Sequence, residues 1–182
     1  LVVICDLINM TLIRQNMGNI KTTSDGGHDF AKAIMTTDTR SKELAISFDL
    51  GGKKVTIGGA AKGAGMIHPN MATMLAFITT DASVGKAFLQ KSLGESVGQS
   101  FNMIDIDNDQ STNDTVLALA NGKSGADEID ENSPDSNTFK EGLTYVCVEL
   151  AKEIVRDAEG AQRLMEVAVE GALSVEDAAK AA

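Results

Sequence analysis

The sequence predicts an α+β protein, because segments with strand periodicity and segments with helical periodicity both occur along its 182 residues. Residues 44–50 alternate apolar and polar side chains, Gly51-Gly52 supplies a turn, and residues 53–58 return as the second strand of a hairpin. Residues 135–158 carry apolar side chains at helical intervals. They form the longest predicted helix, which we expect to end at Gly160.

The remaining elements have weaker patterns. Residues 6–27 mix polar and apolar side chains without a clear period and close in a turn cluster. Ser174, with Asp177 three residues later, predicts the start of a last helix. The other predicted elements are strands at 1–4, 74–80 and 103–106, an edge or surface strand at 164–170, helices at 29–35 and 84–101, an apolar element at 116–120 and an acidic surface loop at 121–134.

Charge and composition exclude several classes of protein. The formal net charge is −10, and an acidic domain repels phosphate backbones, so a nucleic-acid partner is not expected. No apolar run is long enough to cross a membrane, and a cytoplasmic location is the default. Cys5 and Cys147 lie in apolar runs and are predicted to be buried free thiols. Both ends of the chain look cut, which predicts a fragment of a longer protein.

The most informative stretch is residues 62–81. Its first half contains Gly63 and Gly65, which give the backbone unusual freedom, and its second half is the apolar run that predicts a strand. Thr73 stands at the junction, with the small Ala72 before it. That layout is expected where a peptide bond is cut by its own downstream hydroxyl, and where the freed threonine then acts as a nucleophile. Spacing alone leaves a structural threonine as the alternative.

The sequence of residues 62–75, KGAGMIHPNMATML, closely resembles the processing site of the ornithine acetyltransferases, the bifunctional glutamate N-acetyltransferases of arginine biosynthesis. The resemblance implies cleavage between Ala72 and Thr73. It further implies that Thr73 then carries an acetyl group from N-acetylornithine to glutamate in a ping-pong mechanism. No cofactor or metal is implied, and acetyl-coenzyme A is a further donor to be tested.

The same resemblance implies a fold and an assembly. The family fold is a layered α/β sandwich, which agrees with the α+β mixture of strands and helices. The chain would be one incomplete acetyltransferase domain, with residues 1–72 ending the α chain and residues 73–182 beginning the β chain. The two chains of the cleaved precursor would assemble as a heterotetramer.

Three further residues match site residues of the family. Thr36 would bind substrate, while Lys62 and Glu159 would take part in both binding and catalysis. From the residues alone, a structural role stays open for each. Thr36 could belong to a capped loop, Lys62 could be a solvated lysine in the loop around residues 63–65 (the glycine loop), and Glu159 could be a solvated glutamate before Gly160. Glu159 is also disfavoured by the dipole of the predicted helix before it, and such a misplaced residue can have a functional reason.

Asn113 and Asp114 are weaker candidates, because the family has a similar Ser-Thr-Asn-Asp segment that lines the same cavity. The acidic run before them is not a calcium loop, since Gln110 and Val116 stand where an EF-hand requires Gly and Glu.

One departure from the family concerns its oxyanion hole, which is formed by a Thr-Gly pair. The nearest segment here, residues 9–13, has Met and Thr instead, so the location of the oxyanion hole is unassigned. Two functional alternatives therefore stay open. The chain could belong to a self-processing amidohydrolase or aminopeptidase, in which water replaces glutamate, or to an inactive truncated homologue.

Overall fold

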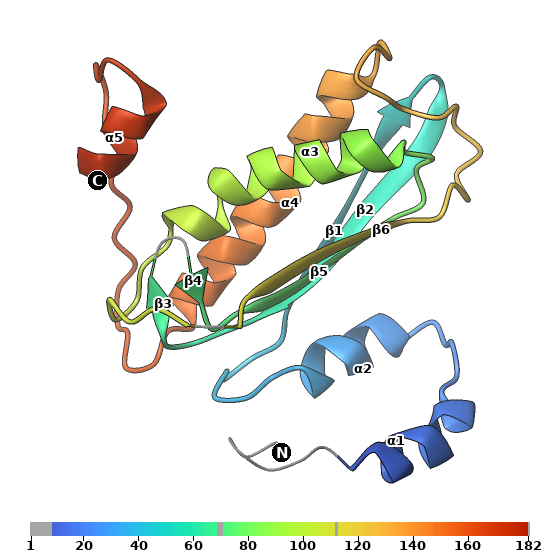
Figure 1. Cartoon of the computed structure of the whole chain (residues 1–182), viewed down its shortest axis with the longest axis horizontal. Helices are drawn as coiled ribbons and strands as arrows, with labels where there is room; N and C mark the ends of the chain where they lie inside the picture. Colours follow the sequence, from blue (N-terminus) through green and yellow to red (C-terminus); the bar gives the residue numbers. More distant parts are fainter. Residues whose placement is uncertain (1–8, 69–70, 112, 182) are drawn as a thin grey trace.

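A mixed four-stranded sheet forms the centre of the structure, a computed structural model that describes residues 9–68, 71–111 and 113–181 (Figure 1). Its strands, in spatial order, are β1 (Lys42–Leu50), β2 (Lys53–Lys62), β5 (Leu75–Thr80) and β6 (Thr115–Ala120). The first three strands are antiparallel neighbours, whereas β6 runs parallel to β5. A parallel pair needs a long crossover, and helix α3 (Lys86–Gly98) lies within this one.

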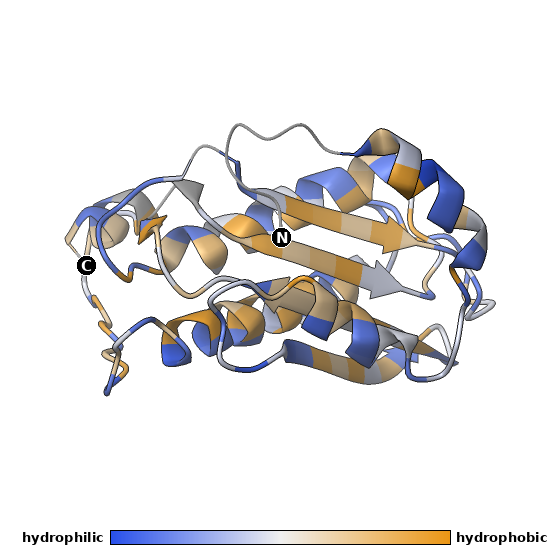
Figure 2. Cartoon of the chain, turned by 90° about the horizontal axis from the view of Figure 1, so that it is seen from below, coloured by the Kyte–Doolittle hydropathy of each residue, from blue (hydrophilic) through white to orange (hydrophobic). Residues whose placement is uncertain are grey.

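Helices lie on both faces of this sheet. α3 and α4 (Ser136–Arg156) pack together over one face, and α2 (Gly26–Ala33) lies on the other side (Figure 1). Phe30 of α2 contacts Phe77 of β5 edge to face, with ring centroids 4.9 Å apart. Figure 2 shows orange, hydrophobic colour along the strands and in stripes on the helices. The predicted layered α+β fold is therefore confirmed.

The core lies between α4 and the sheet. The α4 side chains that face the sheet are fully buried and recur every three or four residues, as the sequence pattern predicts: Phe139, Leu143, Val146, Cys147, Leu150 and Ile154. Cys147 is a free thiol, and burial raises its pKa to about 12. The predicted buried free thiol is confirmed for Cys147, whereas Cys5 lies outside the described residues.

The hairpin of β1 and β2 closes as predicted. Leu50 pairs with Lys53, and the two residues between them, Gly51 and Gly52, have φ of 56° and 76°. Two positive φ angles are what a two-residue turn matching the strand twist requires. β2 is longer than predicted and reaches Lys62, because β5 pairs with the whole of its second half.

A second, smaller hairpin was not predicted. β3 (Ile67–His68) and β4 (Met71–Ala72) pair with each other, and the Ile106 N–H donates to the Ile67 carbonyl at 2.9 Å. The predicted strand 103–106 is wrong. Residues Phe101–Met103 instead form a 3-10 turn, η2, and no strand ladder follows it before β6 within the described residues.

The N-terminal part contains helix α1 (Met10–Asn16) and a 3-10 turn, η1 (Met17–Asn19), in a stretch whose sequence has no clear period. The predicted strand 1–4 lies outside the described residues.

The predicted strand 164–170 is wrong. The segment is mostly exposed and pairs with no strand in the described part of the chain. Helix α5 (Val175–Ala181) follows, and the Asp177 N–H donates to Ser174 Oγ at 3.1 Å, which confirms the predicted cap. Among the described helices, none combines the length and the apolarity that a membrane crossing demands.

Candidate active site

Lys62 ends strand β2, and its side chain turns inward. Only 8% of the residue is exposed, and its Nζ donates to Thr36 Oγ1 at 3.3 Å. The prediction of a lysine in the glycine loop is wrong by one residue, because β5 pairs with β2 as far as Lys62. The structure brings Lys62 and Thr36, predicted separately from distant segments, into one polar contact.

Thr73 lies just before β5 and packs against Gly63. Its N–H donates to the Met66 carbonyl at 2.7 Å, and its Oγ1 is buried with no hydrogen-bond partner in the described structure. Gly63 has φ of 152°, and a Cβ there would lie 3.0 Å from Ile67 Cδ1 and 3.4 Å from the Thr73 carbonyl oxygen. A residue with a side chain would be strained here by the positive φ and crowded by these two atoms, so the tight loop against Thr73 favours glycine.

Glu159 meets the same loop at its next residues. Its N–H donates to the Ala64 carbonyl at 2.8 Å, and its Oε2 lies 3.4 Å from the point where a Cβ on Gly65 would stand. α4 ends at Arg156 rather than at Gly160. Glu159 therefore lies outside the helix, and the predicted helix end at Gly160 is wrong. What holds Glu159 at the glycine loop is a backbone contact across the fold.

A buried group of charges lies directly behind these residues and was not predicted. Lys42, at the start of β1, is 1% exposed and donates to Asp38 Oδ1 and to Asp157 Oδ2, both at 2.6 Å. Asp38 also accepts the N–H groups of Thr36 at 3.1 Å and Gly63 at 2.8 Å. We call Lys42, Asp38 and Asp157 the Lys42 network.

Both carboxylates of the Lys42 network have a lowered pKa, which favours their ionised form. Burial raises the pKa of Asp38, but the bonds from the Gly63 N–H, the Lys42 ammonium and the Thr36 N–H outweigh it and lower the pKa overall. Burial also raises the pKa of Asp157. The hydrogen bonds from Lys42 and Thr39 outweigh this effect, so the pKa of Asp157 is lowered overall. Two carboxylates around one ammonium leave this buried network with a formal excess of negative charge.

Another aspartate fixes the backbone around Thr73. Asp107 accepts the N–H groups of Met66, at 2.5 Å, and of Ile67, at 3.0 Å. These bonds hold Met66 in a left-handed conformation, with φ of 56°. Burial works against the charged form of Asp107, yet the backbone N–H bonds lower its pKa overall.

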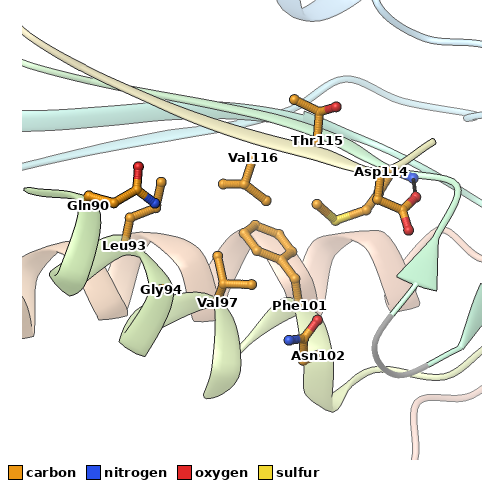
Figure 3. A pocket seen from close by; sticks show the side chains of 10 residues that line it. Gln90, Leu93, Gly94, Val97, Phe101, Asn102, Asp114, Thr115 and Val116 are labelled. Carbon is orange, nitrogen blue, oxygen red and sulfur yellow. Dashed lines mark hydrogen bonds between the residues drawn. The ribbon is translucent and has the colours of Figure 1, made fainter. Parts of the chain in front are cut away.

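Asp114 accepts the Met74 N–H at 3.1 Å, next to Thr73. It borders a cleft of about 280 Å³, in which Leu93, Val97 and Phe101 face Val116 (Figure 3). Asn113 is exposed. The candidates Asn113 and Asp114 therefore separate, and of the two it is Asp114 that contacts the backbone beside Thr73.

The segment compared with the oxyanion-hole pair forms part of α1. The N–H groups of Leu12 and Ile13 bond to Asn9, so the helix uses them. Across residues 9–68, 71–111 and 113–181, no group of three or more His, Cys, Asp or Glu side chains could hold a metal ion.

The arrangement has the groups that acyl transfer requires. A buried hydroxyl, Thr73 Oγ1, belongs to a residue packed on the glycine loop, which follows a buried lysine and faces a carboxylate. Such a set can supply a nucleophile, a cation for an oxyanion or a substrate carboxylate, and an anion for an ammonium group.

The fold and this polar cluster define an α+β protein with its candidate site at one end of a mixed sheet. Within that class, the chain belongs to the ArgJ family, whose family model matches residues 2–182.

Curated relatives agree with this assignment. The arginine biosynthesis bifunctional proteins ArgJ of Dehalococcoides mccartyi, Bacillus licheniformis and Bacillus subtilis are 55%, 51% and 49% identical to 91%, 94% and 97% of this chain. The chain spans 41–43% of the length of these relatives. A solved structure of ArgJ from Bacillus halodurans is 39% identical, with a TM-score of 0.47 over 48% of this chain and 41% of that one.

Proposed function

We propose that the full-length protein carrying this chain is a glutamate N-acetyltransferase that moves the acetyl group of N-acetylornithine to glutamate through Thr73. One observation carries the proposal: three segments that are far apart in sequence come together here. Thr36 contacts Lys62, and Thr73 and Glu159 contact residues 63–65, which follow Lys62 directly. Relatives about half identical to the chain are named for arginine biosynthesis, which supports the same substrates.

The first step is self-cleavage. Thr73 Oγ attacks the Ala72 carbonyl carbon, the Ala72–Thr73 C–N bond breaks, and an ester forms while the Thr73 nitrogen gains a proton. Water then hydrolyses the ester, leaving a carboxylate on Ala72 and a free amine on Thr73. Two features support this step. The Thr73 N–H bond to the Met66 carbonyl restrains the nitrogen of the new N-terminus, and the buried Oγ1 has no hydrogen bond in the described structure that must break before it attacks.

Acetyl transfer follows in two halves. The Thr73 amine, with a reference pKa of about 7.7–8.0, accepts the hydroxyl proton as Oγ attacks the acetyl carbonyl of N-acetylornithine. Ornithine leaves with that proton, and the α-amine of glutamate then attacks the acetyl ester, which restores the Thr73 hydroxyl. Lys62 and Thr36 would hold the substrate and polarise its carbonyl, and Glu159 would bind the amino-acid end or orient the amine.

Cleavage would leave one domain made of two chains. β2 lies before the proposed cut and β5 after it, yet residues 57–62 pair with residues 75–80 in the same sheet. α4 covers strands from the part before the cut. The segments 1–72 and 73–182 would therefore stay associated, and two copies of each chain would form the proposed heterotetramer.

The test uses the full-length protein and its Thr73→Ala variant. Mass spectrometry should find a new N-terminus at Thr73 and, after incubation with N-acetylornithine alone, one acetyl group on that chain. The variant should stay uncut and unacetylated. Glutamate should then take up the acetyl group, and acetyl-coenzyme A is offered separately as a donor.

Two outcomes would overturn the proposal. Release of acetate that does not depend on glutamate would indicate a hydrolase. An uncut parent protein without transfer would indicate an inactive homologue.

A further inference from the structure

The Lys42 network contacts the segments that carry three proposed site residues, Thr36, Lys62 and Glu159. Asp38 receives the N–H of Thr36 itself, at 3.1 Å. The same carboxylate receives the N–H of Gly63, at 2.8 Å, the residue directly after Lys62 and packed against the Thr73 carbonyl. One carboxylate thereby holds Thr36 and the residue next to Lys62, and so restrains both sides of the Lys62–Thr36 contact.

Asp157 extends this support to the third segment. It accepts the Thr39 N–H at 3.0 Å and bonds to the Thr39 hydroxyl, which ties the end of α4 to the loop of Thr36. Two residues later, the Glu159 N–H reaches the Ala64 carbonyl at 2.8 Å. The position of Glu159 therefore depends on where Asp157 anchors the chain.

Lys42 joins the two carboxylates and touches neither the glycine loop nor Thr73 in any side-chain hydrogen bond of the described structure. Burying three charges is costly, and an apolar cluster of similar volume commonly stabilises a protein as well or better. What a buried ion network supplies instead is direction, because its bonds are short and fixed in angle. Here those directions all lead to site segments.

We propose that the Lys42 network is a positioning device for the site, in which Lys42, Asp38 and Asp157 set the relative places of Thr36, Lys62 and Glu159. This role rests on the proposed acetyl transfer through Thr73. None of the three residues is assigned contact with substrate. A displacement of about 1 Å among reacting groups can lower a rate about 10²-fold, so a network one layer behind the site can control it.

The decisive variant is Asp157→Asn in the full-length protein, because it keeps the shape and removes one charge and acceptor. We expect self-cleavage and kcat for acetyl transfer to fall about 10²-fold, with a smaller change in KM. Leu143→Ala is the matched control. It leaves a cavity between α4 and the sheet, in the apolar core where no site residue lies. Both variants are compared at temperatures equally far below their own unfolding midpoints.

Thr39→Val provides a second, milder variant if Asp157→Asn does not fold. It removes one hydroxyl donor to Asp157 and leaves all three charges in place. It should lower the same rates by a smaller factor. If either network variant loses no more activity than Leu143→Ala at matched stability, the Lys42 network has a structural role only.

Amide hydrogen exchange separates this inference from the proposed function. Asp157→Asn removes one charged hydrogen bond from the network. Relative to the parent protein, it should speed amide exchange about tenfold at Thr36, Thr39 and Gly63 and leave the amides of β5 unchanged. If the parent protein shows no acetyl transfer but Asp157→Asn still speeds exchange at these three amides, the proposed function is overturned and the positioning role is kept. Unchanged exchange, or exchange raised equally throughout the sheet, would overturn the positioning role whatever the activity.

Discussion

The middle of the sheet and its end are buried in opposite ways. Gly59 of β2 lies under Val146 and Leu150 of α4, where the nearest atoms are apolar. Two residues further along β2, Ala61 pairs with Lys42, whose ammonium is buried between two carboxylates. Close apolar packing stabilises the first region, whereas directional hydrogen bonds between buried charges stabilise the second. A shape-based region tolerates small adjustments, whereas a buried charge that loses its partner has no inexpensive alternative.

The largest effect that distinguishes these regions should come from Lys42→Met. The change keeps most of the side-chain volume and leaves Asp38 and Asp157 buried without a cation. We expect it to lower the free energy of unfolding by about 3–5 kcal/mol, measured by urea denaturation. The exposed Lys54→Met, in the same hairpin, is the control and should change stability by less than about 0.5 kcal/mol. Equal, small effects would mean that the Lys42 network contributes no more than a surface charge.

In the apolar region, Gly59→Ala should have a smaller effect. A Cβ at this position would lie 2.8 Å from Ile78 Cδ1 and from Leu150 Cδ1, so both of these buried side chains must move. Overpacking of this kind costs about 1–3 kcal/mol in the free energy of unfolding. Gly58→Ala is the neighbouring control, because its nearest contact would be an ordinary 3.5 Å to Ala45 Cβ. A neutral Gly59→Ala would show that the core yields more easily than its packing indicates.

The smallest effect should come from acid, since protonating one carboxylate leaves the other paired with Lys42. The folded-state pKa values of Asp38 and Asp157 are lowered from 3.8. Their stabilising contribution is therefore complete above that value and is lost as the pH falls through the lowered folded-state pKa. Urea midpoints between about pH 6 and about pH 2 should drop more steeply for the parent than for Asp157→Asn. Parallel curves would assign acid sensitivity to other groups.

Local pattern was sufficient for the elements that bury an apolar face. The hairpin of β1 and β2, strand β5, and helices α3 and α4 are where periodicity and turn residues predict them. Local pattern failed for the short strand predicted at 103–106 and for the alternating strand predicted at 164–170. Neither segment has a partner strand among the described residues, and a strand needs a neighbour that local pattern does not provide. The helix α1 was missed because all its residues are exposed, and it has no buried apolar stripe.

The candidate site divides in the same way. The sequence was sufficient to select the segment around Thr73 and the residues Thr36, Lys62 and Glu159. Their local motifs resemble those of the family to which the chain belongs. Only the tertiary structure shows that Thr36 contacts Lys62 and that Thr73 and Glu159 contact the glycine loop that follows it. Only it reveals the Lys42 network, since Lys42 and Asp157 are 115 positions apart and each looks like a surface residue in its own segment. Periodicity reports which face a side chain takes, but the partner of a buried charge is decided by the folding of distant segments against each other.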